Sequence, residues 1–267
     1  MYYLFTIVFF AAHIQLAFGQ GETLVNPRAS GLAYASSTLK DEWAAFSNPA
    51  AAAGCSLVVA SSLSMAPGFP VWNRAAAATT LPFLRGGLSA GFLRTGDALL
   101  NHQVIAAGYA EKIGIAALGF TLQMHQFTAE GYGTRFAPTI SAGGITDLYP
   151  WLSIGAYVTS ATQPRISETE RLSAHFLLGA SMKVSHNVIV LAEVEKDILR
   201  EAVVKTGIVY ELKKNFIVRT GFSPSPMLAS FGFSIRKGAL TIDYAFIFIP
   251  GVIARHQGGC SYTLRKK

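Results

Sequence analysis

The stretch ALGFTLQMHQF, residues 117–127, decides the fold. Large apolar side chains alternate in it with small or polar ones: Leu118, Phe120, Leu122 and Met124 fall on one face, and Gly119, Thr121, Gln123 and His125 fall on the other. This period of two predicts a β-strand with one apolar face and one polar face, and it excludes a helix, whose period is 3.6 residues.

The same alternation recurs along most of the chain. Residues 172–184 and 240–248 repeat it, and short turns rich in Gly, Pro, Asn, Asp or Lys separate such segments. About fourteen strands are expected, an even number as in bacterial outer-membrane barrels. We place them at 56–66, 70–82, 86–95, 101–112, 114–127, 135–144, 151–162, 171–184, 187–196, 202–213, 215–222, 228–236, 239–248 and 253–264.

The composition indicates a membrane protein that crosses the bilayer with strands. Of the 267 residues, 51% are hydrophobic and only 14% are charged, whereas a soluble domain carries about 25% charged residues. Beyond the first twenty residues no apolar run reaches the roughly 18 residues that a transmembrane helix needs. Only helices and closed barrels can satisfy their backbone groups in lipid. We therefore expect an all-β, antiparallel transmembrane barrel in the outer membrane of a Gram-negative bacterium, with membrane lipid as its surroundings.

The N-terminal region divides into two predicted parts before the barrel, which is expected over residues 55–267. Residues 1–19 combine an apolar core with Ala17-Phe18-Gly19, which predicts a signal peptide cleaved before Gln20; an uncleaved helix is the alternative. Residues 20–54 are rich in Ala and are expected to form a luminal or plug segment. A short helix is expected near Lys40–Phe46, ended by the Asn48-Pro49 turn signal.

Two terminal motifs carry a family resemblance. ASGLAYA at residues 29–35 is followed by KDEWAAFSNPA at residues 40–50, and the chain closes on residues 251–264 with His256 and Tyr262. This opening and closing resemble those of FadL-like outer-membrane barrels of the PorV/PorQ type. The opening motif contains Asp41, Glu42, Trp43, Asn48, Pro49 and Ala50.

The resemblance implies a barrel of about fourteen strands whose N-terminal segment enters the lumen, and it implies two roles. PorV/PorQ-like members act as non-enzymatic subunits of type IX secretion and have other outer-membrane or secreted proteins as partners. FadL-like members let hydrophobic small molecules cross the outer membrane. The short loops favour the secretion role, with the channel as the alternative.

Strand alternation places seven charged residues on inward faces. An Arg or Lys facing lipid at mid-membrane costs about 2–4 kcal/mol, so the lumen is the favourable side. Two interpretations stay open: a structural network that fills the lumen, or a polar path and clasp for the N-terminal segment through Asp41 and Glu42. The seven residues are Glu193, Glu195, Lys205, Glu211, Arg219, Arg236 and Asp243.

Cys55 lies at the start of the first expected strand and Cys260 lies in the last, and barrel closure makes these strands neighbours. Both are expected to face outward, and export to an oxidising compartment makes a disulfide between them a hypothesis. The outward rows are also rich in aromatic residues, which are either a lipid-facing band or, around residues 216–248, a protein interface. These are Phe120, Phe176, Tyr210, Phe216, Phe222, Phe231, Phe233, Tyr244, Phe246 and Phe248.

Several function classes are not indicated. Glu193 and Glu195 lie two residues apart on one strand, without the facing geometry of a glycosidase pair, and no Gly-x-Ser-x-Gly elbow occurs. The histidines lack metal-ligand spacing and there is no Cys-x-x-Cys. The net charge of +7 comes from scattered residues and not from a nucleic-acid-binding motif. We expect no enzymatic activity, no cofactor, no metal and no nucleic-acid partner.

Overall fold

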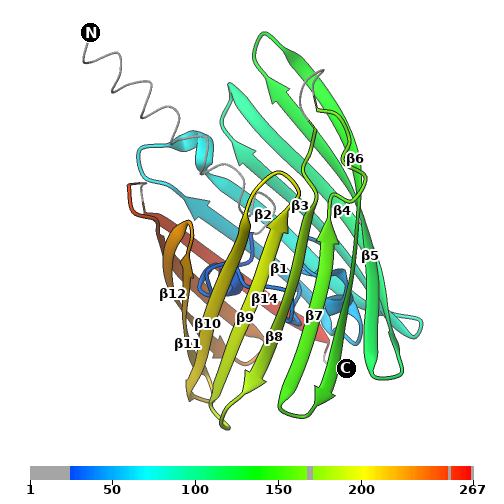
Figure 1. Ribbon diagram of the computed structural model, residues 1–267, viewed down its shortest axis with the longest axis vertical. Coiled ribbons are helices and arrows are strands. Elements are labelled where there is room, and N and C mark those ends of the chain that lie inside the picture. Colours follow the sequence, from blue (N-terminus) through cyan, green and yellow to red (C-terminus); the bar gives the residue numbers. More distant parts are fainter. Residues whose placement is uncertain (1–24, 167–170, 252–253, 266–267) are drawn as a thin grey trace.

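The chain forms one closed barrel of fourteen antiparallel strands, as expected. The structure, a computed structural model, describes residues 25–166, 171–251 and 254–265, so the predicted signal peptide lies outside the described residues. The strands in Figure 1 are β1 Leu57–Met65, β2 Arg74–Phe83, β3 Gly86–Gly96, β4 Leu100–Ile113, β5 Ala116–Ala129, β6 Gly133–Tyr149, β7 Leu152–Thr159, β8 His175–Lys183, β9 Val188–Asp197, β10 Ala202–Lys213, β11 Phe216–Pro224, β12 Met227–Lys237, β13 Leu240–Phe248 and β14 Arg255–Arg265.

Each strand pairs with its neighbours in sequence, and β1 closes the barrel against β14. Ser61 of β1, for example, lies opposite Ala77 of β2 and Cys260 of β14. The predicted alternation is confirmed in β5, where Phe120 is exposed on the outer face and Thr121 is buried on the inner face. The apolar rows therefore face outward and the small and polar rows face the lumen, as a barrel in lipid requires.

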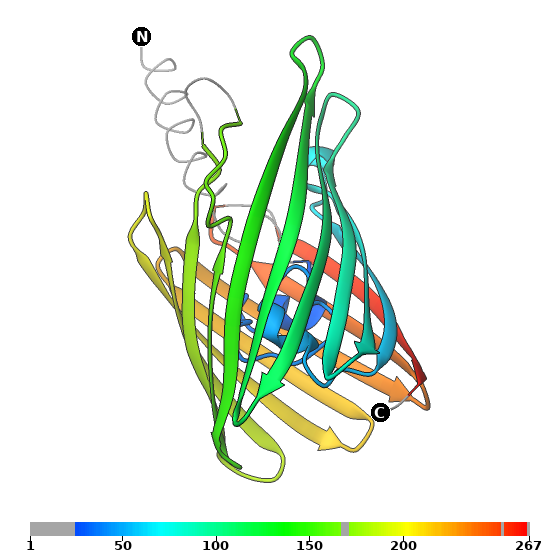
Figure 2. The ribbon, with the colours of Figure 1, turned by 90° about the vertical axis from the view of Figure 1, so that its right-hand side faces the viewer.

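The connections define the two ends of the barrel. At the end that holds the C-terminus they are short, as at 84–85, 114–115 and 214–215, whereas the opposite end has the longer connections 66–73 and 160–174. Outer-membrane barrels have short periplasmic turns and longer extracellular loops, so the C-terminal end is periplasmic. The wall formed by β4, β5 and β6 is the tallest, and Figure 2 shows the β5–β6 hairpin rising beyond the rest.

Residues 25–53, here called the luminal segment, lie inside the barrel (Figure 2). The segment contains the short helix α2, Pro27–Ser30, which contacts β12, β13 and β14, and the 3-10 helix η2, Pro49–Ala52, which contacts β3 to β6. The side chains of Asn26 and Asn48 cap these helices by accepting hydrogen bonds from the backbone N–H groups of Arg28 and Ala50. A third short helix, η3 (Pro70–Trp72), lies in the β1–β2 connection.

The helix expected near Lys40–Phe46 is wrong, because residues 41–47 form turns. The Asp41 carboxylate accepts the backbone N–H of Trp43, and the Trp43 carbonyl accepts the N–H groups of Phe46 and Ser47. This arrangement turns Trp43 and Phe46 into the same apolar cluster against the wall, which outweighs the helix propensity of the two alanines between them. Asn48 accordingly starts the helix η2 and does not end one. In the described part of the chain no helix is both long and apolar enough to cross a membrane.

Candidate functional site in the barrel lumen

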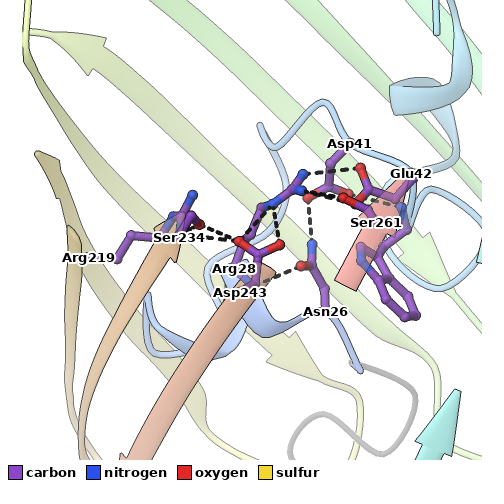
Figure 3. Close-up of polar contacts among 9 residues, drawn as sticks. Asn26, Arg28, Asp41, Glu42, Arg219, Ser234, Asp243 and Ser261 are labelled. Carbon is purple, nitrogen blue, oxygen red and sulfur yellow. Dashed lines mark hydrogen bonds and ion pairs between the residues drawn. The ribbon is translucent and has the colours of Figure 1, made fainter. Parts of the chain in front are cut away.

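An ion cluster at Arg28 holds the first part of the luminal segment against the wall. Figure 3 shows the Arg28 guanidinium between Asp243 of β13, at 3.1 Å, and Glu42 of the segment itself, at 3.0 Å. Arg28 also donates to a third partner, the Ser261 hydroxyl of β14, at 3.2 Å. Burial disfavours the charged guanidinium, but the neighbouring carboxylates of Glu42 and Asp243 outweigh it and raise the pKa of Arg28 above its usual value.

The cluster contains more acidic than basic groups. Asp243 also lies 3.8 Å from Arg219 of β11, and Asp41 accepts a 2.6 Å bond from the Asn26 amide. Three carboxylates, from Asp41, Glu42 and Asp243, thus meet the two guanidiniums of Arg28 and Arg219. Burial and the charge of Glu42 raise the pKa of Asp41 to about 6. One carboxyl of the cluster is therefore close to protonation near neutral pH.

A second cluster holds the middle of the segment. The Glu193 carboxylate of β9 accepts the backbone N–H groups of Ser36 and Ser37 at 2.8 and 2.7 Å. Lys205 of β10, which is 2% exposed, pairs with Glu193 at 3.2 Å and with Glu195 at 2.5 Å. The wall therefore binds the backbone of the segment through a carboxylate whose charge Lys205 balances.

The end of the segment is held by amide hydrogen bonds and apolar packing. Asn48, which is fully buried, donates from its amide nitrogen to the carbonyls of Ser37 at 2.7 Å and Gly144 of β6 at 3.1 Å. Trp43 and Phe46 pack against inner-wall residues of β1 to β4. Lys40 pairs with Asp147 at 2.6 Å, but both side chains are about half exposed.

Gln257 of β14 links the luminal segment to the seam of the barrel. Its amide nitrogen donates to the carbonyl of Val25 at 2.5 Å and to the hydroxyl of Ser62 in β1 at 2.8 Å. Its amide oxygen accepts a 2.6 Å bond from the Ser30 hydroxyl. One side chain thus bonds to the segment and to the first strand while it belongs to the last.

Glycines line the inner wall where the luminal segment crosses it. A Cβ atom added at Gly155 of β7 would overlap the carbonyl of Ser37, and one at Gly221 of β11 would overlap the backbone of Leu32 and Ala33. The wall therefore admits the segment only because these positions lack side chains. Close approaches to the segment also occur at Gly87, Gly91, Gly119, Gly143, Gly179, Gly207, Gly232 and Gly259.

The structure brings five of the seven expected luminal charges together in the two clusters. Glu193, Glu195, Lys205, Arg219 and Asp243 are buried there, while Glu211 is half-buried and Arg236 is exposed near the periplasmic strand ends. Asp41 and Glu42 bind Asn26 and Arg28 of their own segment, and Arg28 makes the ion pair with the wall. Sequence reasoning missed Arg28. The signal that could have identified it is a cation within a segment expected to lie in the lumen, where strands with inward-facing carboxylates surround it.

The expected disulfide is not formed. Cys260 lies opposite Ser61, six positions along the chain from Cys55, and its thiol contacts the Ser61 hydroxyl at 3.3 Å. Cys55 precedes β1, and the four strand positions from Leu57 to Ser61 alone span about 13 Å, well beyond the roughly 7 Å that a disulfide allows between Cα atoms. Cys55 also does not face outward as expected, because its sulfur lies beside inward-facing Gly87 near Ala52.

The outer face carries the expected aromatic residues. Phe120, Phe176, Phe222, Phe231 and Phe248 are each between 44% and 51% exposed, and Phe233, Tyr244 and Phe246 lie in the same outer rows. An apolar outer band faces lipid in outer-membrane barrels, and a protein interface around residues 216–248 stays the alternative prediction. Among the described residues, no group of three or more His, Cys, Asp or Glu side chains is arranged to hold a metal ion.

The fold is shared with solved structures of a hydrocarbon channel and of toluene transporters. The CymD monoaromatic hydrocarbon channel superimposes with a TM-score of 0.69 and 12% identity, covering 90% of this chain and 98% of that chain. The Ralstonia pickettii toluene transporter TbuX superimposes with a TM-score of 0.72 and 10% identity, covering 91% of this chain and 98% of that chain. The Pseudomonas putida toluene transporter TodX superimposes with a TM-score of 0.66 and 11% identity, covering 89% of this chain and 97% of that chain. No protein-family model and no curated protein matches the sequence.

These similarities and the apolar outer face define the class. The chain is an outer-membrane β-barrel of a Gram-negative bacterium. More narrowly, its fourteen strands and short N-terminal segment give it the fold of the CymD, TbuX and TodX structures.

Proposed function

We propose that this protein is a channel that lets small, largely hydrophobic aromatic molecules cross the outer membrane, and that the luminal segment is its plug. The observation that carries the proposal is the agreement in fold with three structures described as aromatic hydrocarbon channels or toluene transporters, over 97–98% of their chains. The channel role therefore has better support than the secretion role.

The contacts of the luminal segment fit a plug that moves. It binds the wall through ion pairs and hydrogen bonds, and the glycines let it lie close without interlocking side chains at most crossings. Ion pairs inside a barrel are strong only while both partners stay in place; removing one partner of a buried pair costs about 3–5 kcal/mol. Displacement of the segment at Arg28 or at Glu193 therefore requires that water replace these contacts.

A reversible lock tests the channel and its plug together. The Cβ of Leu32 lies 3.2 Å from a Cβ added at Gly207, close to the spacing of a disulfide. Leu32→Cys with Gly207→Cys, in a Cys55→Ser, Cys260→Ser background, should fix the segment to β10 when oxidised. Initial uptake of radiolabelled toluene is then measured in cells that lack other such channels, because a phospholipid vesicle does not hold back a hydrocarbon.

We expect uptake above that of vector-only cells, at least a severalfold loss on oxidation, and recovery on reduction. The Leu32→Cys single variant is the matched control and should not respond to oxidation. Uptake equal to vector-only cells for the native chain would contradict the channel. Uptake that is equal in the oxidised and reduced double variant would contradict a moving plug.

The secretion role implied by the PorV/PorQ resemblance stays a prediction. The observation that favours it is the lumen itself, which is filled at the level of the luminal segment. Extraction of the native protein in mild detergent, followed by mass analysis, separates the two roles. A stoichiometric complex with large outer-membrane or surface proteins would support secretion, and a lone barrel would support the channel.

A further inference from the structure

Five inward-facing side chains form one continuous row at the extracellular mouth, just above the luminal segment. Successive cross-strand pairs join Arg74 of β2 to Thr95 of β3, Thr95 to His102 of β4, His102 to Phe127 of β5, and Phe127 to Arg135 of β6. We call these five residues the aromatic row. In each strand the residue two positions deeper into the barrel is buried on the inner wall. Side chains two positions apart in a strand point to the same side, so all five lie on the luminal face.

The rings of the row are stacked. The centroids of His102 and Phe127 are 4.2 Å apart with their planes at 5°, and His125, one level deeper, continues the stack at 5.2 Å from His102. His125 is held by hydrogen bonds to His102 at 3.0 Å and to the Thr139 hydroxyl at 3.2 Å. The ring planes are therefore fixed, and His102 and Phe127 are only half-buried.

An arginine lies near each end of this stack, Arg135 beside Phe127 and Arg74 on the side of His102. Strands lie about 4.8 Å apart, so Arg135 is one strand spacing from Phe127 and Arg74 is two spacings from His102. The short Thr95 occupies the position between His102 and Arg74, and its buried hydroxyl has no hydrogen-bond partner among the described residues. Arg135 is exposed, while Arg74 is half-buried and close enough to His102 to act on it electrostatically.

The level below differs in character. The next row consists of Ala76, Leu93, Val104, His125 and Ala137, all buried, and Trp43 and Phe46 of the luminal segment pack against it. This level is apolar except for His125, whose ring nitrogens bond to His102 and to the Thr139 hydroxyl, so the two guanidiniums lie only at the mouth level. A ligand held at the mouth would need a flat apolar body to fit the rings and a negative group to fit the guanidiniums.

We infer that the aromatic row is a binding site for flat aromatic carboxylates, whose ring extends the stack of His102 and Phe127 and whose carboxylate pairs with Arg74 or Arg135. This inference rests on the proposed channel function and names a substrate class for its extracellular mouth. Stacked rings favour planar faces over puckered ones. Guanidinium binds carboxylate with two parallel hydrogen bonds, which a neutral analogue does not accept in the same way.

Three probes separate the two parts of the recognition. Benzoate carries the ring and the charge, benzyl alcohol carries only the ring, and cyclohexanecarboxylate carries only the charge. Their dissociation constants are measured on the purified, folded barrel by saturation-transfer NMR. We expect benzoate to bind about tenfold more tightly than either of the other two, as the loss of one charge-assisted contact predicts.

Matched variants locate the site. Arg74→Gln with Arg135→Gln should remove the preference for benzoate over benzyl alcohol, and Phe127→Leu should remove the preference for benzoate over cyclohexanecarboxylate. Arg94→Gln and Phe92→Leu change the same residue types on the exposed outer face of β3 and should leave all three constants unchanged. Heat-dependent mobility on a gel verifies that each barrel is folded.

Equal affinity for the three probes in the native chain, or preferences that survive the luminal variants, would overturn the inference. Toluene uptake by cells then separates it from the proposed function. Uptake without a benzoate preference would remove the site and keep the channel. A benzoate preference that depends on the row, without uptake of toluene, would keep the site and remove the hydrocarbon channel.

Discussion

Arg28 and Asp243, which lie 215 positions apart in the sequence, form a 3.1 Å ion pair inside the barrel. The pair ties the start of the luminal segment to β13, and Glu42 lies on the other side of the same guanidinium. Sequence separation of this size means that the contact forms only when the barrel is nearly complete. It is the clearest link between the segment and the wall.

Replacing Arg28 should destabilise the folded barrel strongly. Arg28→Ala leaves Glu42 buried without a cation and leaves Asp243 with Arg219 alone, at 3.8 Å, and we expect a loss of about 3–5 kcal/mol in the free energy of unfolding. Urea unfolding in detergent followed by circular dichroism measures it. Lys40→Ala is the matched control, because the Lys40–Asp147 pair is exposed and should contribute less than about 1 kcal/mol. Equal losses in the two variants would contradict the role of Arg28.

Asp41 should make stability depend on pH in an unusual direction. Its pKa is raised to about 6 in the folded chain by burial and by Glu42, from an ordinary value of 3.8. The folded state therefore binds this proton more readily than the unfolded state. The free energy of unfolding should rise as the pH falls from about 6 to about 4, and the ionised Asp41 should lower it at a pH above about 6.

The comparison with Asp41→Asn isolates this effect from other carboxylates. The variant cannot ionise, so its stability relative to the native chain should be greatest at pH 7 and should decline as the pH approaches 4. Unfolding free energies at four pH values between 4 and 7 measure the difference. A difference that does not change with pH would show that Asp41 keeps an ordinary pKa.

The inner-wall glycines should be sensitive to a single methyl group. Gly221→Ala places a Cβ against the backbone of Leu32 and Ala33, and we expect the luminal segment to move away from β11. Limited proteolysis should then cut the segment several times faster than in the native chain. Gly258→Ala of β14 is the control, since a Cβ there meets no atom within 4 Å. Equal protection of both variants would mean that the wall yields and the segment stays.

The two cysteines should behave as separate thiols. Alkylation of the denatured chain without reductant should add two alkyl groups to the intact mass, because the register keeps Cys55 and Cys260 apart. A native chain that takes up neither group, and takes up both after reduction, would contradict the register of β1 and β14.

Strands were predictable from the sequence because alternation is a local property. Thr121 and Phe120 take opposite sides of the wall whatever their neighbours are, and residues 202–213 match β10 residue for residue. The buried charges Glu193 and Asp243 followed from the same rule, since lipid excludes them.

Contacts across strands were not predictable, because they depend on register. The aromatic row requires the registers of five strands at once, and the alternation within a strand contains no information about them. The helix expected near Lys40–Phe46 failed for a related reason: the wall around Trp43 and Phe46 decides the path of the segment. Arg28 was missed because its partner lies in β13, at the far end of the chain.

Gln257 has a consequence for how the barrel comes apart. Because this one side chain bonds to Val25, Ser30 and Ser62, the first strand, the last strand and the segment between them share a single set of hydrogen bonds. Separating β1 from β14 breaks the hydrogen bonds that hold the luminal segment at Gln257. Withdrawing the segment removes hydrogen bonds that stabilise the β1–β14 pair. The β1–β14 seam and the luminal segment should therefore open as one cooperative unit. The segment then contributes to closing the barrel and does not only fill its lumen.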